Sequence, residues 1–183
     1  EIGYLTDLIS DRAVDYVQRV GGTAQPFFLS LHYTAPHWPW ESRDEAHVAP
    51  EVAKNLFHLD GGNIHTYRRM IHHMDEGIGR LMAALRAQGI ERDTLVVFTS
   101  DHGDYLGDHW LGEKELFHDT IVKVPLIVVD PRPAADATRG LVRDELVESI
   151  DLLPSFLQAL GLPDAPEWLE GRSLQPLLHE RAG

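Results

Sequence analysis

The sequence contains no cysteine, and this absence excludes three kinds of chemistry from the chain. Disulfide bonds, zinc sites built on thiolates and a cysteine nucleophile all need that side chain. Positive charge is also scarce, since 16 basic residues accompany 29 acidic ones and the formal net charge is −13. Contacts to nucleic-acid phosphates require clustered lysine and arginine, so we expect no nucleic-acid partner.

Long hydrophobic runs are missing as well. No apolar run approaches the roughly 18 residues of a membrane-spanning helix, so we expect no membrane span. The sequence has no signal peptide, but it does not begin with methionine and enters an amphipathic pattern at once. We therefore expect a soluble fragment. A cytoplasmic and a periplasmic location both stay open, and so does the formation of a homo-oligomer.

The periodicity of the apolar residues predicts an α/β fold, with helices flanking a mostly parallel sheet. Strands are expected at 27–31, 95–98 and 126–129. Helices are expected at 8–20, 63–88 and 151–160, with a short one after Ser173. The first strand, the long helix and the second strand make a βαβ unit, which is expected to be parallel and right-handed. Residues 41–62 are polar and predict a long loop.

Two of these helices have recognisable ends. Thr6 or Asp7 is expected to cap the first helix, and Gly21 supplies its stop. Gly89 ends the long helix. The apolar residues of the long helix recur at helical spacing and predict its buried face. They are Ile64, Tyr67, Ile71, Met74, Ile78, Leu81 and Leu85.

Asp101 and His102 come directly after the second predicted strand, and α/β sheets bind their ligands beyond such strand ends. A carboxylate and an imidazole in that position can both reach a metal ion. The alternative is that Asp101 caps the following turn and His102 is an ordinary surface histidine. Asp108 and His109 form a second pair of this kind, which either orients a ligand or hydrogen-bonds its own backbone.

Two further side chains suit an anionic substrate. The ammonium of Lys114 is a compact positive charge that matches a sulfuryl or phosphoryl oxygen, although surface ion pairs are the alternative. His37 follows the first predicted strand, between two prolines that fix its backbone. It is suited to donating a proton to a substrate oxygen or a leaving group, or else it packs against Trp38 or Trp40.

Several stretches, in their order along the chain, resemble the second half of a sulfatase of the alkaline phosphatase superfamily. The central one is TSDHGDYLGDH at 99–109, which is followed by Lys114 and by VPLIV at 124–128. The others are PFFLSL at 26–31, APHWP at 35–39, MDEGIGRL at 74–81, SIDLLP at 149–154 and EGRSL at 170–174. The resemblance implies an alkaline phosphatase-like α/β fold that is incomplete in this chain. It makes 1–183 the C-terminal portion of that domain, with about 141–183 as its C-terminal helical segment.

What the resemblance implies is the metal-dependent hydrolysis of a small-molecule sulfate ester. Asp101 and His102 match two metal ligands of the family, which follow its second metal-bearing strand. Lys114 matches the lysine that binds the sulfate. His37 matches the histidine that contacts the sulfate or assists departure of the leaving group. The nucleophile of the family is a formylglycine made from cysteine or serine, and its metal is usually calcium.

Two departures from the family pattern bear on this expectation. Many sulfatases carry asparagine where His102 stands, whereas Asp-His also occurs in phosphonate monoester hydrolases of the superfamily. Those enzymes favour manganese-like metals, in agreement with the preference of imidazole for transition metals. The alternative activity is therefore the hydrolysis of phosphonate monoesters or phosphodiesters.

The second departure is an absence. The Cys/Ser-x-Pro-x-Arg motif that carries the nucleophile does not occur in the sequence, and neither do the paired aspartates of the first strand of the family. We therefore expect the nucleophile and the remaining metal ligands upstream of Glu1, and we expect this chain to be inactive alone. A non-catalytic fragment with a structural Asp-His loop is the remaining alternative.

Overall fold

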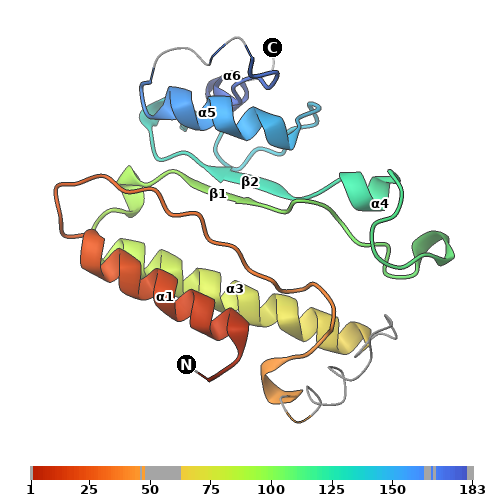
Figure 1. Ribbon diagram of the computed structural model, residues 1–183. Coiled ribbons are helices and arrows are strands. Elements are labelled where there is room, and N and C mark those ends of the chain that lie inside the picture. Colours follow the sequence, from red (N-terminus) through yellow and green to blue (C-terminus); the bar gives the residue numbers. More distant parts are fainter. Residues whose placement is uncertain (1, 46, 48–62, 163–165, 167, 181–183) are drawn as a thin grey trace. The chain divides into compact units, whose positions relative to one another are not determined.

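The computed structural model describes residues 2–45, 47, 63–162, 166 and 168–180 (Figure 1). The chain forms two compact units, Glu1–Glu91 and Arg92–Gly183, and each is considered by itself. Most of the loop predicted at 41–62 lies outside the described residues, apart from a 3₁₀ turn at Arg43–Glu45. Among the helices that are described, none combines the length and the apolar character needed to cross a membrane.

The first unit is built on two helices, α1 (Leu5–Val20) and α3 (Ile64–Ala87), where the periodicity predicts them. α1 begins directly after Tyr4, which makes no side-chain cap. The expectation that Thr6 or Asp7 caps this helix was therefore wrong, because both residues lie inside its first turn. Thr6 is buried there, so its side chain contributes to packing.

α3 has the ends that the sequence predicts. The side chain of Asn63 caps it by accepting hydrogen bonds from the backbone N–H groups of His65, at 2.8 Å, and Thr66, at 3.2 Å. Beyond the last turn, Gly89 adopts a φ of +71°, the left-handed conformation that commonly ends helices.

The two helices approach each other closely and run parallel. Ser10 lies against Gly77, where an added Cβ would come within 2.1 Å of the serine hydroxyl oxygen. One end of the pair is marked by Gly21, where an added Cβ would come within 2.8 Å of Gln88. In both contacts the two residues are separated by the same number of positions along the chain. The two helices therefore run in the same direction, as Figure 1 shows. Only glycine leaves enough room at position 77.

The face of α3 that is buried differs from the apolar stripe predicted for it. At 100° per residue the centres of the two faces are about 90° apart around the helix axis, and Leu85 belongs to both. Ile64 and Ile71, which belong to the predicted stripe, remain 41% and 37% exposed. At Gly77 the close approach of α1 leaves no room for a side chain. The buried residues of α3 are Thr66, Met70, His73, Gly77, Ala84 and Leu85.

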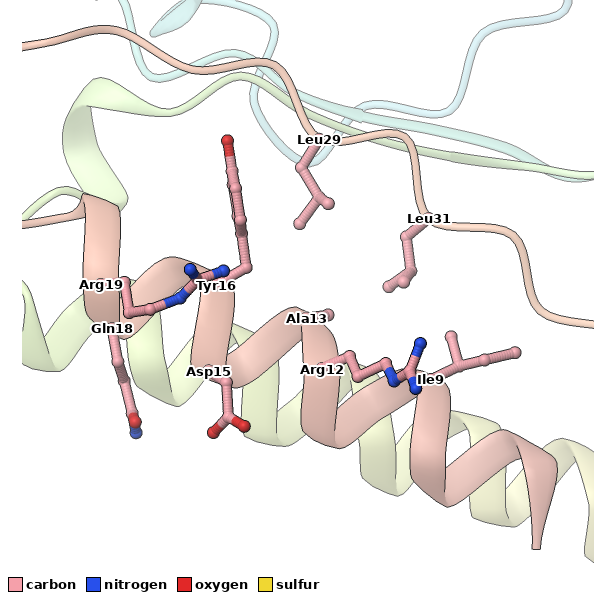
Figure 2. A pocket seen from close by; sticks show the side chains of 9 residues that line it. All are labelled: Ile9, Arg12, Ala13, Asp15, Tyr16, Gln18, Arg19, Leu29 and Leu31. Atoms are coloured by element: carbon pink, nitrogen blue, oxygen red, sulfur yellow. The ribbon is translucent and has the colours of Figure 1, made fainter. Parts of the chain in front are cut away.

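The segment predicted as a strand at 27–31 has no regular secondary structure. The βαβ unit is therefore not formed by the described residues, because a strand needs a hydrogen-bonded neighbour and their one sheet joins two other strands. Leu29 and Leu31 point toward α1 and line a cavity of about 740 Å³ with it (Figure 2). None of the four residues predicted to carry chemistry lines this cavity.

The sheet of the second unit consists of β1 (Val96–Thr99) and β2 (Leu126–Val129). Both apolar runs form strands as predicted, but they pair antiparallel, with Val96 opposite Val129. The parallel arrangement is thus not present in this pair. Ile127 and Val129 are 58% and 44% exposed, so β2 is not buried on both of its faces.

One face of this sheet is covered by α5 (Leu152–Ala159) and α6 (Gln175–His179), close to the positions predicted for two helices. Figure 1 shows α5 lying across the two strands. The buried hydroxyl of Ser155 joins the helices by accepting a hydrogen bond from the backbone N–H of Leu174 at 2.8 Å. Side chains of the strands and both helices line one narrow cavity. They include Leu95, Val97, Val128, Leu152, Phe156, Leu174 and Leu178.

Asp130 anchors the end of β2 to α6. Its side chain is 1% exposed and accepts hydrogen bonds from the Arg132 guanidinium, at 2.6 Å, and from Nε2 of His179, at 2.9 Å. Burial by itself would raise the pKa of Asp130, but the hydrogen bonds from Arg132 and His179 hold that pKa well below its usual range. The carboxylate is therefore ionised and fully paired.

Candidate active site

Asp101 and His102 lie just beyond the end of β1, as the sequence predicts. Nδ1 of His102 is 2.8 Å from the backbone carbonyl oxygen of Gly103. A carbonyl only accepts hydrogen bonds, so Nδ1 carries the proton, and in the neutral imidazole Nε2 keeps its lone pair. Nε2 lies 3.3 Å from Oδ2 of Asp101, whose side chain is 83% exposed. The two side chains thus present a nitrogen and an oxygen lone pair side by side.

The charge state of Asp101 suits the same use. Desolvation acts to raise its pKa, but hydrogen bonds from its own backbone N–H and that of His102, together with attraction to the His102 imidazole in its charged form, bring the pKa below its ordinary value. The carboxylate is therefore ionised at neutral pH, and it can bind the same cation as Nε2 of His102.

The donor pair fits part of a metal site. Two ligands at right angles around a cation, each about 2.3 Å from it, are about 3.3 Å apart, which is the spacing of a calcium shell. A histidine that donates Nδ1–H to a carbonyl and keeps Nε2 for the metal is the usual arrangement of such ligands. Over the described ranges, no group of three or more acidic or histidine side chains converges. Asp101 and His102 therefore fit as two ligands of a larger set.

Gly103 starts the loop that carries Lys114. Its backbone N–H donates to the carbonyl oxygen of Ile121 at 2.7 Å, which brings the two ends of the loop together. An added Cβ at position 103 would lie 1.9 Å from the carbonyl oxygen of Thr120, so the approach requires glycine. Further along, the N–H of Tyr105 donates to the carbonyl oxygen of Glu113 at 2.9 Å. The exposed residue Lys114 is thus attached to the same hydrogen-bonded loop as Asp101 and His102.

His37 belongs to the first unit and is considered by itself. Its backbone N–H closes a turn on the carbonyl oxygen of Thr34 at 2.9 Å. Nδ1 is 2.6 Å from the carbonyl oxygen of Trp38, so this nitrogen carries the proton. The imidazole also lies near the Trp38 indole, at 5.8 Å between ring centroids. The surroundings of His37 therefore agree with both predicted roles, donation of a proton and packing against an aromatic ring.

Sequence reasoning missed two residues of the loop. Tyr105 is 1% exposed, and its hydroxyl lies 2.7 Å from Nδ1 of His118. No periodic pattern marks a hydrogen bond between two loop residues thirteen positions apart. The pair Asp108 and His109 did attract attention, and His109 proves to stack on His118 with 4.3 Å between ring centroids.

The fold can be compared with solved structures. The crystal structure of the phosphonate monoester hydrolase of Agrobacterium radiobacter is similar to this chain with a TM-score of 0.77 and 26% sequence identity, over 96% of this chain and 43% of that one. The chain therefore has the α/β fold of alkaline phosphatase-like hydrolases, in incomplete form, as the sequence predicts. The helix-rich units with one small sheet are parts of that fold.

The family follows from the sequence match. The family model named Sulfatase matches residues 2–162, so this chain belongs to the sulfatase family. Two curated relatives are a multifunctional alkaline phosphatase superfamily protein, PehA of Trinickia caryophylli, and an arylsulfatase of Clostridium perfringens. The first is 32% identical over 213 residues, covering 93% of this chain and 40% of the relative. The second is 28% identical over 204 residues, covering 96% of this chain and 42% of the relative.

The chain spans about two fifths of the length of these curated relatives. Membership of the family confirms the resemblance stated from the motifs, and it makes the protein one of a family of hydrolases. The roles of Asp101, His102, Lys114 and His37 stay predictions.

Proposed function

We propose that this chain is part of a metal-dependent hydrolase of small-molecule sulfate esters. The observation that carries the proposal is the pair at the end of β1. Nε2 of His102 and Oδ2 of Asp101 lie 3.3 Å apart, and in the neutral form of the imidazole both atoms carry a lone pair. Membership of the sulfatase family supports this use of the pair.

The chemistry is assigned as follows. Asp101 and His102 hold a divalent cation, and the cation, when bound, stabilises negative charge on the group being transferred. Calcium is our first choice for that cation, with manganese or a similar metal as the alternative. Lys114 neutralises charge that develops on a sulfuryl oxygen. His37, when protonated at Nε2, donates that proton to the leaving oxygen, and its Nδ1–H bond to the carbonyl oxygen of Trp38 keeps the ring in position.

The remaining parts of the site are proposed to lie upstream of Glu1. The sequence has no Cys/Ser-x-Pro-x-Arg motif, and the two donors at Asp101 and His102 fall short of the six to eight oxygen ligands that calcium takes. A formylglycine in the upstream segment would supply the nucleophile, and further carboxylates there would complete the metal shell. The chain of 183 residues is then inactive without that segment.

The test is hydrolysis of an aryl sulfate by the full-length protein and by its Lys114→Ala and His37→Ala variants. We expect each substitution to lower kcat by about 100-fold or more, as is typical for groups that stabilise transition-state charge or transfer a proton. The His37→Ala loss should be smaller for substrates with a better leaving group, because these need less protonation. Variants that keep the wild-type rate would contradict the assignment. A full-length protein with neither activity nor bound metal would support the non-catalytic alternative.

Hydrolysis of phosphonate monoesters or phosphodiesters is the second candidate, and His102 favours it. An imidazole ligand shifts a site from calcium toward transition metals. One of the similar solved structures is itself a phosphonate monoester hydrolase. The two candidates are separated by kcat/KM of the full-length protein on an aryl sulfate and on a phosphonate monoester with the same leaving group. A ratio above one supports the sulfatase, and a ratio far below one supports the second candidate.

A further inference from the structure

The loop that carries Lys114 is held in an unusual backbone conformation. Leu106, His109, Trp110 and Glu113 all have positive φ values, between 49° and 60°, although none of them is glycine. Non-glycine residues persist in this conformation only where their surroundings fix them. The surroundings that fix this loop therefore bear on where Lys114 is held.

A cluster of three rings lies inside the loop. Tyr105 is buried, with its hydroxyl 2.7 Å from Nδ1 of His118, and the two rings meet edge to face at 5.6 Å between centroids. The imidazole of His109 stacks on His118 at 4.3 Å between centroids, tilted by 26°, and it also meets the Tyr105 ring edge to face at 6.1 Å. His118 is thus held by a hydrogen bond within the cluster and by a stacked ring.

Tyr105 contacts the chain on both sides of Lys114. Its backbone N–H bonds to the carbonyl oxygen of Glu113, the residue that precedes the lysine, at 2.9 Å. Its hydroxyl bonds to His118, four residues after the lysine. One buried side chain and its own backbone therefore restrain both flanks of an exposed lysine.

We infer that Tyr105 and His118 are positioning residues for Lys114. Their hydrogen bond sets the backbone of the Lys114 segment relative to Asp101 and His102, to which the same loop is joined through Gly103. The inference rests on the proposed function, in which Lys114 neutralises charge on the transferred group. A flexible ammonium contributes to a transition state only when its attachment point is fixed, because misplacement of a charged group by about 1 Å costs about 100-fold in rate.

The experiment is a double-mutant cycle in the full-length protein, with Tyr105→Phe and Lys114→Ala measured singly and together. Tyr105→Phe removes the hydroxyl and keeps the ring. We expect it to lower kcat/KM for an aryl sulfate by about tenfold. This is the lower end of the range of losses seen when a partner that orients a functional group is removed. In the Lys114→Ala background the same substitution should change kcat/KM by less than about twofold, because the group that it positions is gone.

Two variants separate positioning from folding. His118→Asn keeps a polar group where Nδ1 was, so it should retain most of the activity that His118→Ala loses. Ser155→Ala is the matched control, since it removes another buried hydrogen bond in the same unit, that with Leu174 at 2.8 Å. It should lower the melting temperature without any coupling to Lys114.

The outcomes are distinct. A tenfold effect of Tyr105→Phe that persists unchanged in the Lys114→Ala background would overturn the inference and leave the proposed function intact. A His118→Asn variant as impaired as His118→Ala would also count against the inference. Full activity of Lys114→Ala alone would instead contradict the role that the proposed function gives to the lysine.

Discussion

Each of the two units is stabilised internally, and the kind of contact that does so differs between them. In the first, α1 and α3 pack through small side chains that recur at helical spacing, with Gly77 against Ser10 as the tightest point. In the second, single polar or glycine residues make the decisive contacts, such as Asp130 between β2 and α6 and Gly103 at the base of the loop. Recurring contacts leave a pattern in the sequence, whereas single contacts leave none.

The largest effect on stability is expected at Asp130. Asp130→Ala leaves the Arg132 guanidinium and His179 without their shared acceptor, and a loss of about 3 kcal/mol is expected, the lower end for a broken buried ion pair, because the Arg132 side chain is 36% exposed. Urea unfolding of the protein measures this cost. Asp136→Ala is the control, because that carboxylate is exposed and pairs with Arg139 at the surface, so little change is expected. Equal losses in the two variants would show that Asp130 is not the anchor of the second unit.

Gly103→Ala is expected to cost about 2–3 kcal/mol, since its Cβ would meet the carbonyl oxygen of Thr120 and the backbone there must move. It should also lower hydrolytic activity, because the loop that carries Lys114 begins at this point. Gly112→Ala lies in the same loop but meets nothing within 4 Å, and it serves as the matched control. We compare the melting temperature and kcat of the two variants. Both values should fall in Gly103→Ala and stay unchanged in Gly112→Ala if glycine is required at position 103.

Gly77→Ala tests the first unit in the same way, and a loss of about 1–2 kcal/mol is expected. The clash is with a hydroxyl that can rotate, but rotation breaks the hydrogen bonds of Ser10 with the carbonyl oxygen of Thr6 and with the hydroxyl of Tyr33. Gly79→Ala, two positions on in the same helix, meets nothing within 4 Å. That control should gain about 0.5–1 kcal/mol, because alanine favours helices over glycine. A loss at position 79 equal to that at 77 would refute close packing as the cause.

The smallest effect is the pH dependence that Asp130 contributes. Its pKa in the folded state lies below the unfolded value of about 3.9, so its stabilisation is complete above about pH 5 and is lost as the pH falls toward the folded pKa. The difference in unfolding free energy between the wild type and Asp130→Asn should therefore shrink by about 1 kcal/mol from pH 5 to pH 3. A difference that does not change with pH would mean that Asp130 is not held ionised by its partners.

The same contrast explains how much of the fold was predictable. Both ends of α3 and the C-terminal end of α1 follow from periodicity and from glycine and asparagine at these ends, because these signals are local, whereas the start of α1 at Leu5 lies before the predicted start. The orientation of β1 against β2 does not, because it depends on which strands pair, and an apolar run carries no direction. The buried face of α3 was misjudged for a similar reason: Gly77 is weakly hydrophobic, and only the approach of α1 makes it interior.

The position of one part of the candidate site, the part that follows a strand end, could be predicted from the sequence. Asp101 and His102 lie directly after β1, and their order along the chain with Lys114 and His37 is what resembled the sulfatases. The hydrogen bond between Tyr105 and His118 was beyond reach, because it joins two loop residues whose positions depend on the folded loop. The sequence suggests Asp108 and His109 as an acid–imidazole pair, although the contact that the structure shows is the stacking of His109 on His118.

The most direct test of the account is the metal content of the full-length protein, measured by elemental analysis for the wild type and for the double variant Asp101→Asn, His102→Ala. We expect about one divalent cation per chain in the wild type. In the double variant we expect a loss of that cation, with a parallel loss of aryl sulfate hydrolysis that excess calcium or manganese partly restores. Equal metal content in both proteins, or full activity of the double variant after treatment with a chelator, would contradict the claim that the strand-end pair holds the metal.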